Sequence, residues 1–160
     1  MMHNKVFTLQ EAHMEFAKKL NGRVWELLAK EDRTQKEDDE MIQAAHASLY
    51  HWLQVGTAVH QQRGFWMLAH VYTVLEHQEE ALYNAERCLQ ITKQYPEQMQ
   101  DFDFAYGFEG AARASALTGD RTKAAEYKKK ASDAGEKIAN EEDKSIFLGD
   151  LMGGNWYGVD

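Results

Sequence analysis

The sequence has 160 residues, with one proline, one cysteine, 44% hydrophobic residues and a formal net charge of −8. This length and hydrophobicity suffice for a buried core, which excludes a disordered or collagen-like chain. Nucleic acid is not expected as a partner, because an acidic chain repels phosphates. No signal-peptide pattern opens the sequence, and no apolar run approaches the roughly 18 residues of a membrane span. We therefore expect a cytoplasmic protein with no membrane partner.

Helix start and stop signals divide most of the chain into six helices and a short C-terminal segment. Thr8 with Glu11 forms a capping-box pattern, Gly119 followed by Asp120 indicates a helix stop and the next N-cap, and Pro96 ends another helix. No strand-like alternation is sustained. The expected helices cover about residues 8–28, 38–55, 57–76, 78–95, from between 97 and 103 to 118, and 120–139, the charged residues 30–40 forming a connection and a first turn.

The first two helices are predicted from residues recurring at helical spacing. The expected apolar face of the first helix consists of Leu9, Ala12, Phe16, Leu20, Trp25 and Leu28. The expected core face of the second consists of Met41, Ala45, Ser48, Leu49, Trp52 and Val55. Its opposite face carries a polar strip, Gln43, His46, Tyr50 and Gln54, which we treat as a secondary candidate for ligand contact.

The later helices contain an internal repeat, which indicates a fold of stacked helical units. The first copy consists of Phe65, Leu68, Ala69 and Tyr72, then Ala81 and Cys88. The second consists of Phe108, Ala111, Ala112 and Ser115, then Ala124 and Ala131. Small residues recur where two antiparallel helices would cross, which allows close approach of their backbones.

This pattern resembles the tetratricopeptide repeat (TPR), whose first helix carries a large residue, then Leu-Gly or Leu-Ala, then Tyr, and whose second helix begins on Ala. The copies are 43 residues apart, longer than the usual spacing of about 34. Ser115 replaces the tyrosine and Lys128 the later aromatic residue. The resemblance implies one all-α domain, a superhelix of stacked antiparallel helix pairs. Its parts would be an atypical first pair (8–55), two repeats (57–95 and 97–139), and a cap helix with a tail (141–160).

The same resemblance implies a concave groove lined by the first helix of each repeat, where the family binds peptides. The positions concerned are Arg63, Trp66, His70 and Thr73 in one copy and Tyr106, Glu109 and Arg113 in the other. Guanidinium groups match carboxylates and aromatic rings supply contact area, so we expect an acidic or C-terminal peptide as the partner. Glu109 and Arg113 are four residues apart and could instead pair with each other.

Catalytic and metal-binding signatures are scarce. Helical metal sites need ligands three or four residues apart; no two of the seven histidines have this spacing, and no acidic residue lies three residues before any of them. No phosphate-binding loop or nucleophile elbow occurs. Cys88 is expected to be an inert core thiol. We therefore expect no catalytic residue, no metal and no cofactor.

The leading hypothesis is a non-enzymatic protein or peptide interaction module. A first alternative is a small-ligand or metal-binding sensor or enzyme with a pocket containing His46 and His70. A second is a self-associating structural protein, forming a homodimer. The glycine-rich tail, with Trp156, Tyr157 and the carboxylate of Asp160, is interpreted as a flexible end, or as an arm that docks into the groove.

Overall fold

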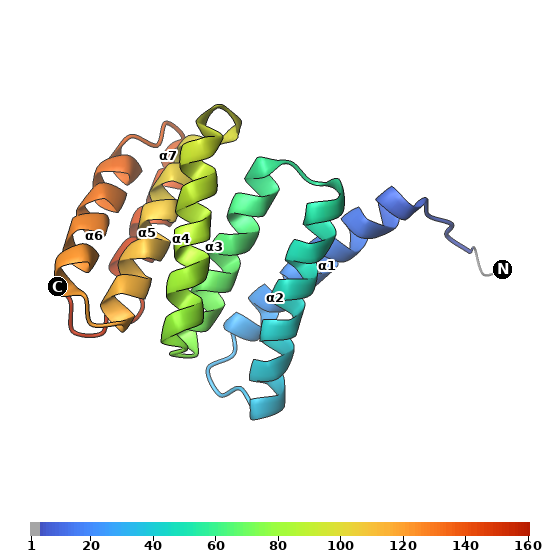
Figure 1. Ribbon diagram of the computed structural model, residues 1–160, viewed down its shortest axis with the longest axis horizontal. Coiled ribbons are helices and arrows are strands. Elements are labelled where there is room, and N and C mark those ends of the chain that lie inside the picture. Colours follow the sequence, from blue (N-terminus) through green and yellow to red (C-terminus); the bar gives the residue numbers. More distant parts are fainter. Residues whose placement is uncertain (1–3) are drawn as a thin grey trace.

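The computed structural model describes residues 4–160, which form seven α-helices, one short 3-10 helix and no strand. In chain order the elements are α1 (Leu9–Leu28), α2 (Gln35–Val55), α3 (Ala58–Val74), α4 (Gln78–Gln94), η1 (Pro96–Gln98), α5 (Asp101–Leu117), α6 (Arg121–Glu136) and α7 (Glu141–Met152). The most extensive contacts join α1 to α2, α3 to α4, and α5 to α6, and neighbouring pairs stack side by side (Figure 1). The predicted all-α fold of stacked helix pairs is confirmed. None of the described helices is long and apolar enough to cross a membrane.

Local caps explain where several helices begin and end. Thr8 and Glu11 form the predicted capping box: the Thr8 hydroxyl accepts from the Glu11 N–H at 3.1 Å, and the Glu11 carboxylate accepts from the Thr8 N–H at 2.9 Å. Gly119, at a φ of 84°, makes the left-handed turn after α5. Asp120 then caps α6 by accepting from the Lys123 N–H at 3.1 Å.

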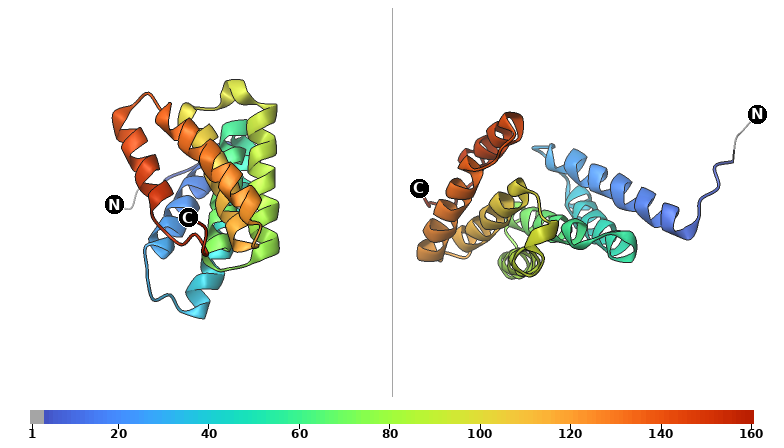
Figure 2. Two further views of the ribbon diagram at one scale, coloured as in Figure 1. Left: turned by 90° about the vertical axis from the view of Figure 1, so that its left-hand side faces the viewer. Right: turned by 90° about the horizontal axis from the view of Figure 1, so that it is seen from above.

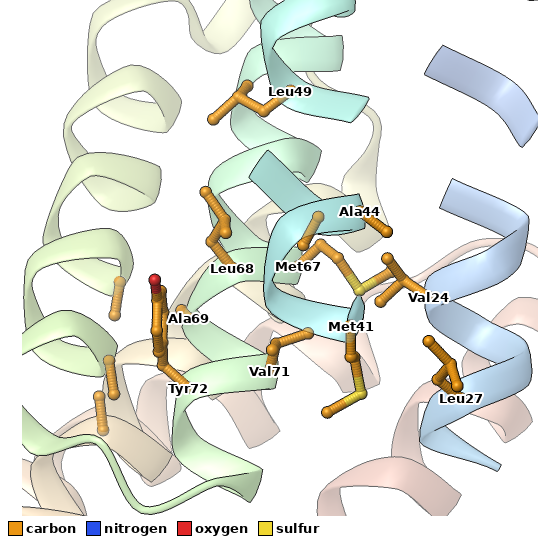
Figure 3. Close-up of a cluster of buried hydrophobic side chains, with 14 of the residues drawn as sticks. Val24, Leu27, Met41, Ala44, Leu49, Met67, Leu68, Ala69, Val71 and Tyr72 are labelled. Carbon is orange, nitrogen blue, oxygen red and sulfur yellow. The ribbon is translucent and has the colours of Figure 1, made fainter. Parts of the chain in front are cut away.

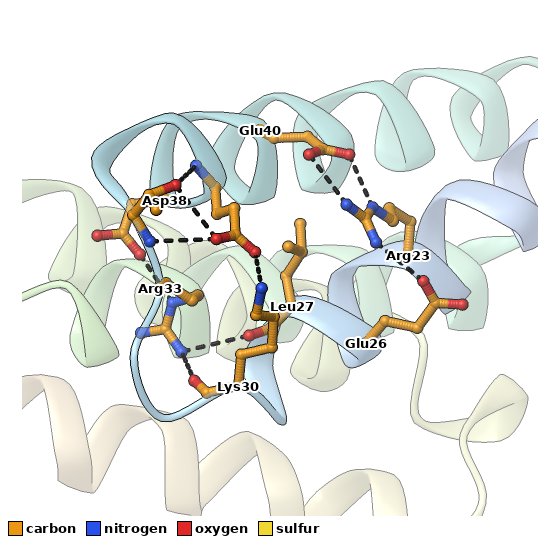
Figure 4. Close-up of polar contacts among 9 residues, drawn as sticks. Arg23, Glu26, Leu27, Lys30, Arg33, Asp38 and Glu40 are labelled. Carbon is orange, nitrogen blue, oxygen red and sulfur yellow. Dashed lines mark hydrogen bonds and ion pairs between the residues drawn. The ribbon is translucent and has the colours of Figure 1, made fainter.

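The second helix begins at Gln35, three residues earlier than predicted. A capping box of Thr34 and Glu37 starts it, a signal hidden within a stretch expected to be a connection. The same stretch joins α1 to α2 through charged side chains (Figure 4). Arg33 donates to the carbonyls of Leu27 and Lys30 at 3.3 and 2.6 Å, which satisfies acceptors at the end of α1.

The core is divided between two clusters. The larger lies among α1, α2, α3, α4 and the end of α5, and Figure 3 shows ten of its members: Val24, Leu27, Met41, Ala44, Leu49, Met67, Leu68, Ala69, Val71 and Tyr72. The smaller joins α5 and α6 to α7 and is centred on Phe147, which is fully buried. The four alanines of the repeat pattern, Ala69, Ala81, Ala112 and Ala124, are each at most 1% exposed. Small residues therefore occupy buried positions of both later helix pairs.

Enlarging either of two repeat alanines should destabilise the fold. We expect Ala69→Leu and Ala112→Leu each to lower the free energy of unfolding by about 1–3 kcal/mol, because added methylenes overpack a close helix contact. Chemical denaturation measures the change. Ala125 is exposed on α6 beside buried Ala124, so Ala125→Leu is the matched control and should change little. Unchanged stability in both buried variants would mean that these positions are not close-packed crossings.

The odd-numbered helices, α1, α3, α5 and α7, line the inner side of the stack. Seen from above, α1 and α7 lie on either side of a hollow whose base is formed by α3 and α5 (Figure 2). The last helix reaches this position by packing on both α5 and α6. Residues from the beginning, middle and end of the chain therefore meet on one inner surface.

Candidate functional site

The inner surface contains a partly open groove of about 630 Å³. Its lining includes six of the seven predicted groove residues: Trp66, His70, Thr73, Tyr106, Glu109 and Arg113. The seventh, Arg63, lines an adjoining hollow of about 270 Å³, which shares Trp25, Trp66, Tyr106 and Asp150 with the groove. The structure thus brings the candidate residues of the two helices together.

The Arg113 side chain forms its hydrogen bonds with groups of its own chain. It is 7% exposed, and its Nε lies 2.6 Å from Oε1 of Glu109, which is 3% exposed. Its two terminal nitrogens donate to the backbone carbonyls of Asp150 at 2.6 Å, Gly153 at 2.8 Å and Asn155 at 3.2 Å. The pairing of Arg113 with Glu109, left open by the sequence, is confirmed.

Arg63 is also paired. Its guanidinium makes two hydrogen bonds, of 2.8 and 3.0 Å, to the two carboxylate oxygens of buried Asp103. Asp103 also accepts from the Gln100 N–H at 2.8 Å, at the N-terminus of α5. Both arginines that were expected to receive a ligand's carboxylate therefore already hold a carboxylate of this chain.

Aromatic rings form one wall of the groove. Trp66 stacks on His70 with ring centroids 5.0 Å apart and meets the edge of Tyr106 at 5.3 Å. Trp25 of α1 lies against Trp66, with centroids 6.1 Å apart. The Trp66 Nε1–H donates to Oε2 of Glu109 at 2.9 Å, which fixes the ring. Trp66 and Tyr106 are both partly accessible to solvent, as expected of groove residues.

Sequence reasoning missed several lining residues of the groove, among them Trp25, Glu76 and Asp150. Trp25 was assigned to the apolar core face of the first helix, but it is 47% exposed. Leu9 and Phe16, assigned to the same face, are exposed as well, so this prediction was wrong at three positions. The core face of α1 is instead formed by Ala17, Val24 and Leu27. No periodicity could have indicated Asp150, because its place depends on how α7 folds back.

The C-terminal tail closes one side of the groove. The Tyr157 hydroxyl donates to the Thr73 carbonyl at 2.8 Å, and Trp156 Nε1–H donates to the Leu151 carbonyl at 3.0 Å. The Trp156 ring has the Arg113 guanidinium at 4.1 Å and the Lys128 ammonium at 4.3 Å from its centroid. The tail was interpreted either as a flexible end or as a docking arm, and in the structure it is docked. Backbone carbonyls and aromatic rings make these contacts.

The histidine pocket of the alternative hypothesis is not assembled. His46 lies in a hollow separate from the one that contains His70, and its Nε2 is 2.8 Å from the Tyr72 hydroxyl. Tyr50, its neighbour in the predicted polar strip, is exposed. No group of three or more His, Cys, Asp or Glu side chains within residues 4–160 is placed to hold a metal ion. Cys88 is buried, and burial raises the pKa of its thiol, which suppresses the reactive thiolate.

Burial of His70 predicts a pH dependence of stability. Burial lowers the pKa of His70 in the folded state below its ordinary value of 6.5; Glu109 and Asp150 partly oppose this shift, and Arg113 adds to it. As the pH falls below 6.5, the unfolded chain therefore takes up a proton that the folded chain does not, and stability is lost. We expect His70→Gln to lose less stability than the wild type between pH 7.5 and pH 5.5 in chemical denaturation. Equal losses would contradict this.

Comparison with known proteins returns no relative. No family model matches the sequence, and no curated protein and no solved structure is significantly similar to it. The function is therefore inferred from the chemistry of the groove.

Proposed function

We propose that this protein is a TPR-like, non-enzymatic interaction module that binds an extended segment of a partner protein in the inner groove. Two features support the TPR-like part of the proposal. The repeat alanines are buried in both later helix pairs, and the first helix of each pair contributes to the groove. Stacked helix pairs of this kind create concave surfaces suited to extended ligands.

The exposed aromatic wall is the observation that supports binding of a partner segment in the groove. A tryptophan that is nearly half exposed, stacked on a second partly exposed tryptophan inside a groove, leaves apolar area in contact with water. Tryptophan and tyrosine are the residues that most often anchor a binding partner. Trp25, Trp66 and Tyr106 meet this description together.

Peptides selected from a displayed random library test the proposal. Calorimetry would measure their affinities, and ¹H–¹⁵N NMR spectra would locate their contacts. We expect shifts in residues of α1, α3, α5 and α7 and a loss of affinity of about tenfold or more in Trp25→Ala. Tyr83→Ala is the control, because Tyr83 is 61% exposed on α4, which does not line the groove. Shifts confined to α2, α4 and α6, or equal losses in both variants, would refute the proposal.

Self-association is a second candidate function, favoured by the surface at the N-terminal end of the stack. Large apolar side chains are exposed on and beside α1 and α2: Val6, Leu9, Phe16, Tyr50 and Leu53. A second copy of the chain would cover them in a homodimer. Light scattering after size exclusion should then show a dimer that Phe16→Glu converts to a monomer. A wild-type monomer at all concentrations would exclude this candidate.

A further inference from the structure

The charges that line the groove do not cancel. Both arginines are compensated by carboxylates of this chain, as described above. Two more carboxylates line the groove: Asp150 on α7 and Glu76 after α3. Neither forms an ion pair within residues 4–160. Burial lowers the pKa of His70, so its imidazole adds no positive charge at neutral pH. The groove therefore keeps a net negative charge.

The Asp150 carboxylate lies at the edge of the aromatic wall. Its Oδ2 accepts a 2.6 Å hydrogen bond from the hydroxyl of Tyr106, whose ring meets Trp66 edge-on. Asp150 and the two tryptophans Trp25 and Trp66 line both the groove and the adjoining hollow. Arg113 positions this carboxylate, because it holds the Asp150 backbone carbonyl at 2.6 Å.

Aromatic faces beside an uncompensated carboxylate suit an organic cation. The rings attract the positive charge through their quadrupoles, and the carboxylate supplies a charge-assisted hydrogen bond. The same chemistry occurs elsewhere in this chain, where Trp156 is contacted by both Arg113 and Lys128. An anionic ligand would instead meet Asp150 and Glu76 and find neither arginine unpaired.

We infer that the partner segment is anchored by a lysine or arginine side chain, which lies on Trp25 and Trp66 with its charged head against Asp150. This inference rests on the proposed function and specifies its ligand. The long stem of either residue covers apolar surface while the head reaches a carboxylate. A basic anchor is thus the opposite of the acidic partner expected from the sequence, an expectation that stays untested.

The test uses nine-residue Ala-Ser peptides that differ only in a central Lys, Arg, norleucine or Glu, with butylammonium as a free-amine arm. NMR titration would follow the indole resonances of Trp25 and Trp66. We expect the Lys and Arg peptides to bind about tenfold or more tightly than the norleucine and Glu peptides. Asp150→Asn, which keeps an acceptor for Tyr106, should abolish most of this difference. Glu86→Gln removes the same charge from exposed α4 and should preserve it.

The possible results distinguish the basic anchor from the interaction module itself. Equal binding of all four peptides, preference for the Glu peptide, or an undiminished preference in Asp150→Asn would overturn the basic anchor while leaving the interaction module intact. Absence of groove binding by these peptides and by the library-selected peptides would overturn both. Binding of butylammonium as tight as that of the Lys peptide would replace the partner segment with a free amine.

Discussion

Replacing Arg113 with alanine is expected to lower the free energy of unfolding by about 3–5 kcal/mol, because it leaves a buried charge without its partner. Glu109 is 3% exposed, and Trp66 Nε1–H would be its remaining side-chain donor. The variant also frees the carbonyls of the tail that the guanidinium now binds. Urea denaturation at neutral pH measures the effect.

The control is an exposed pair at the same helical spacing. Lys130 and Glu126 form such a pair on α6, and Lys130→Ala should lower stability far less than Arg113→Ala, because an exposed pair is screened by solvent. The double variant Arg113→Met with Glu109→Leu should lose less stability than Arg113→Ala, because it leaves no buried charge. A loss in Arg113→Ala no larger than in Lys130→Ala would show that the pair is not the anchor of the tail.

Removing the Phe147 ring is expected to cost about 3–5 kcal/mol, the usual range for truncating a fully buried phenylalanine. The ring meets Tyr106 edge-on with centroids 4.8 Å apart and lies against Gly135, where an added Cβ would be 2.4 Å from the ring. It therefore joins α7 to both α5 and α6. Phe147→Ala should also weaken peptide binding, because α7 carries Asp150.

The neighbouring residue supplies the comparison. Ile146 is 53% exposed on the same helix, so Ile146→Ala should change stability by no more than about 0.5 kcal/mol. Thermal denaturation and peptide affinity would be measured on both variants. Equal effects in the two would mean that α7 is not held to the stack through Phe147.

Much of the fold could be predicted because its signals are local. The capping box at Thr8, the left-handed turn at Gly119 and the cap at Asp120 each depend on residues at most three positions apart. The pairing of adjacent helices could be predicted from helical periodicity and from the repeated alanines. The start of α2 was missed because the Thr34 capping box lies within a charged stretch typical of a connection.

The candidate site was predicted only in part, because its chemistry depends on contacts between distant residues. The third and fifth helices were expected to share a groove, and they do. Most hydrogen-bond partners of their arginines could not be predicted from the sequence. Arg63 binds Asp103, 40 residues away, and Arg113 binds carbonyls 37 to 42 residues away. These pairings neutralise both arginines, so that Asp150 and Glu76 leave the groove negatively charged, and no spacing rule indicates them.

A crystal structure of the chain with the tightest library-selected peptide would show whether the groove holds a basic side chain. We expect the peptide on the inner surface between α1 and α7, with a lysine or arginine side chain against Trp25 and within hydrogen-bond distance of the Asp150 carboxylate. Arg63 and Arg113 would keep their bonds to Asp103 and Glu109. A peptide carboxylate bound to Arg63 or Arg113 in place of these partners would contradict this expectation. A peptide seated on α2, α4 and α6 would contradict it as well.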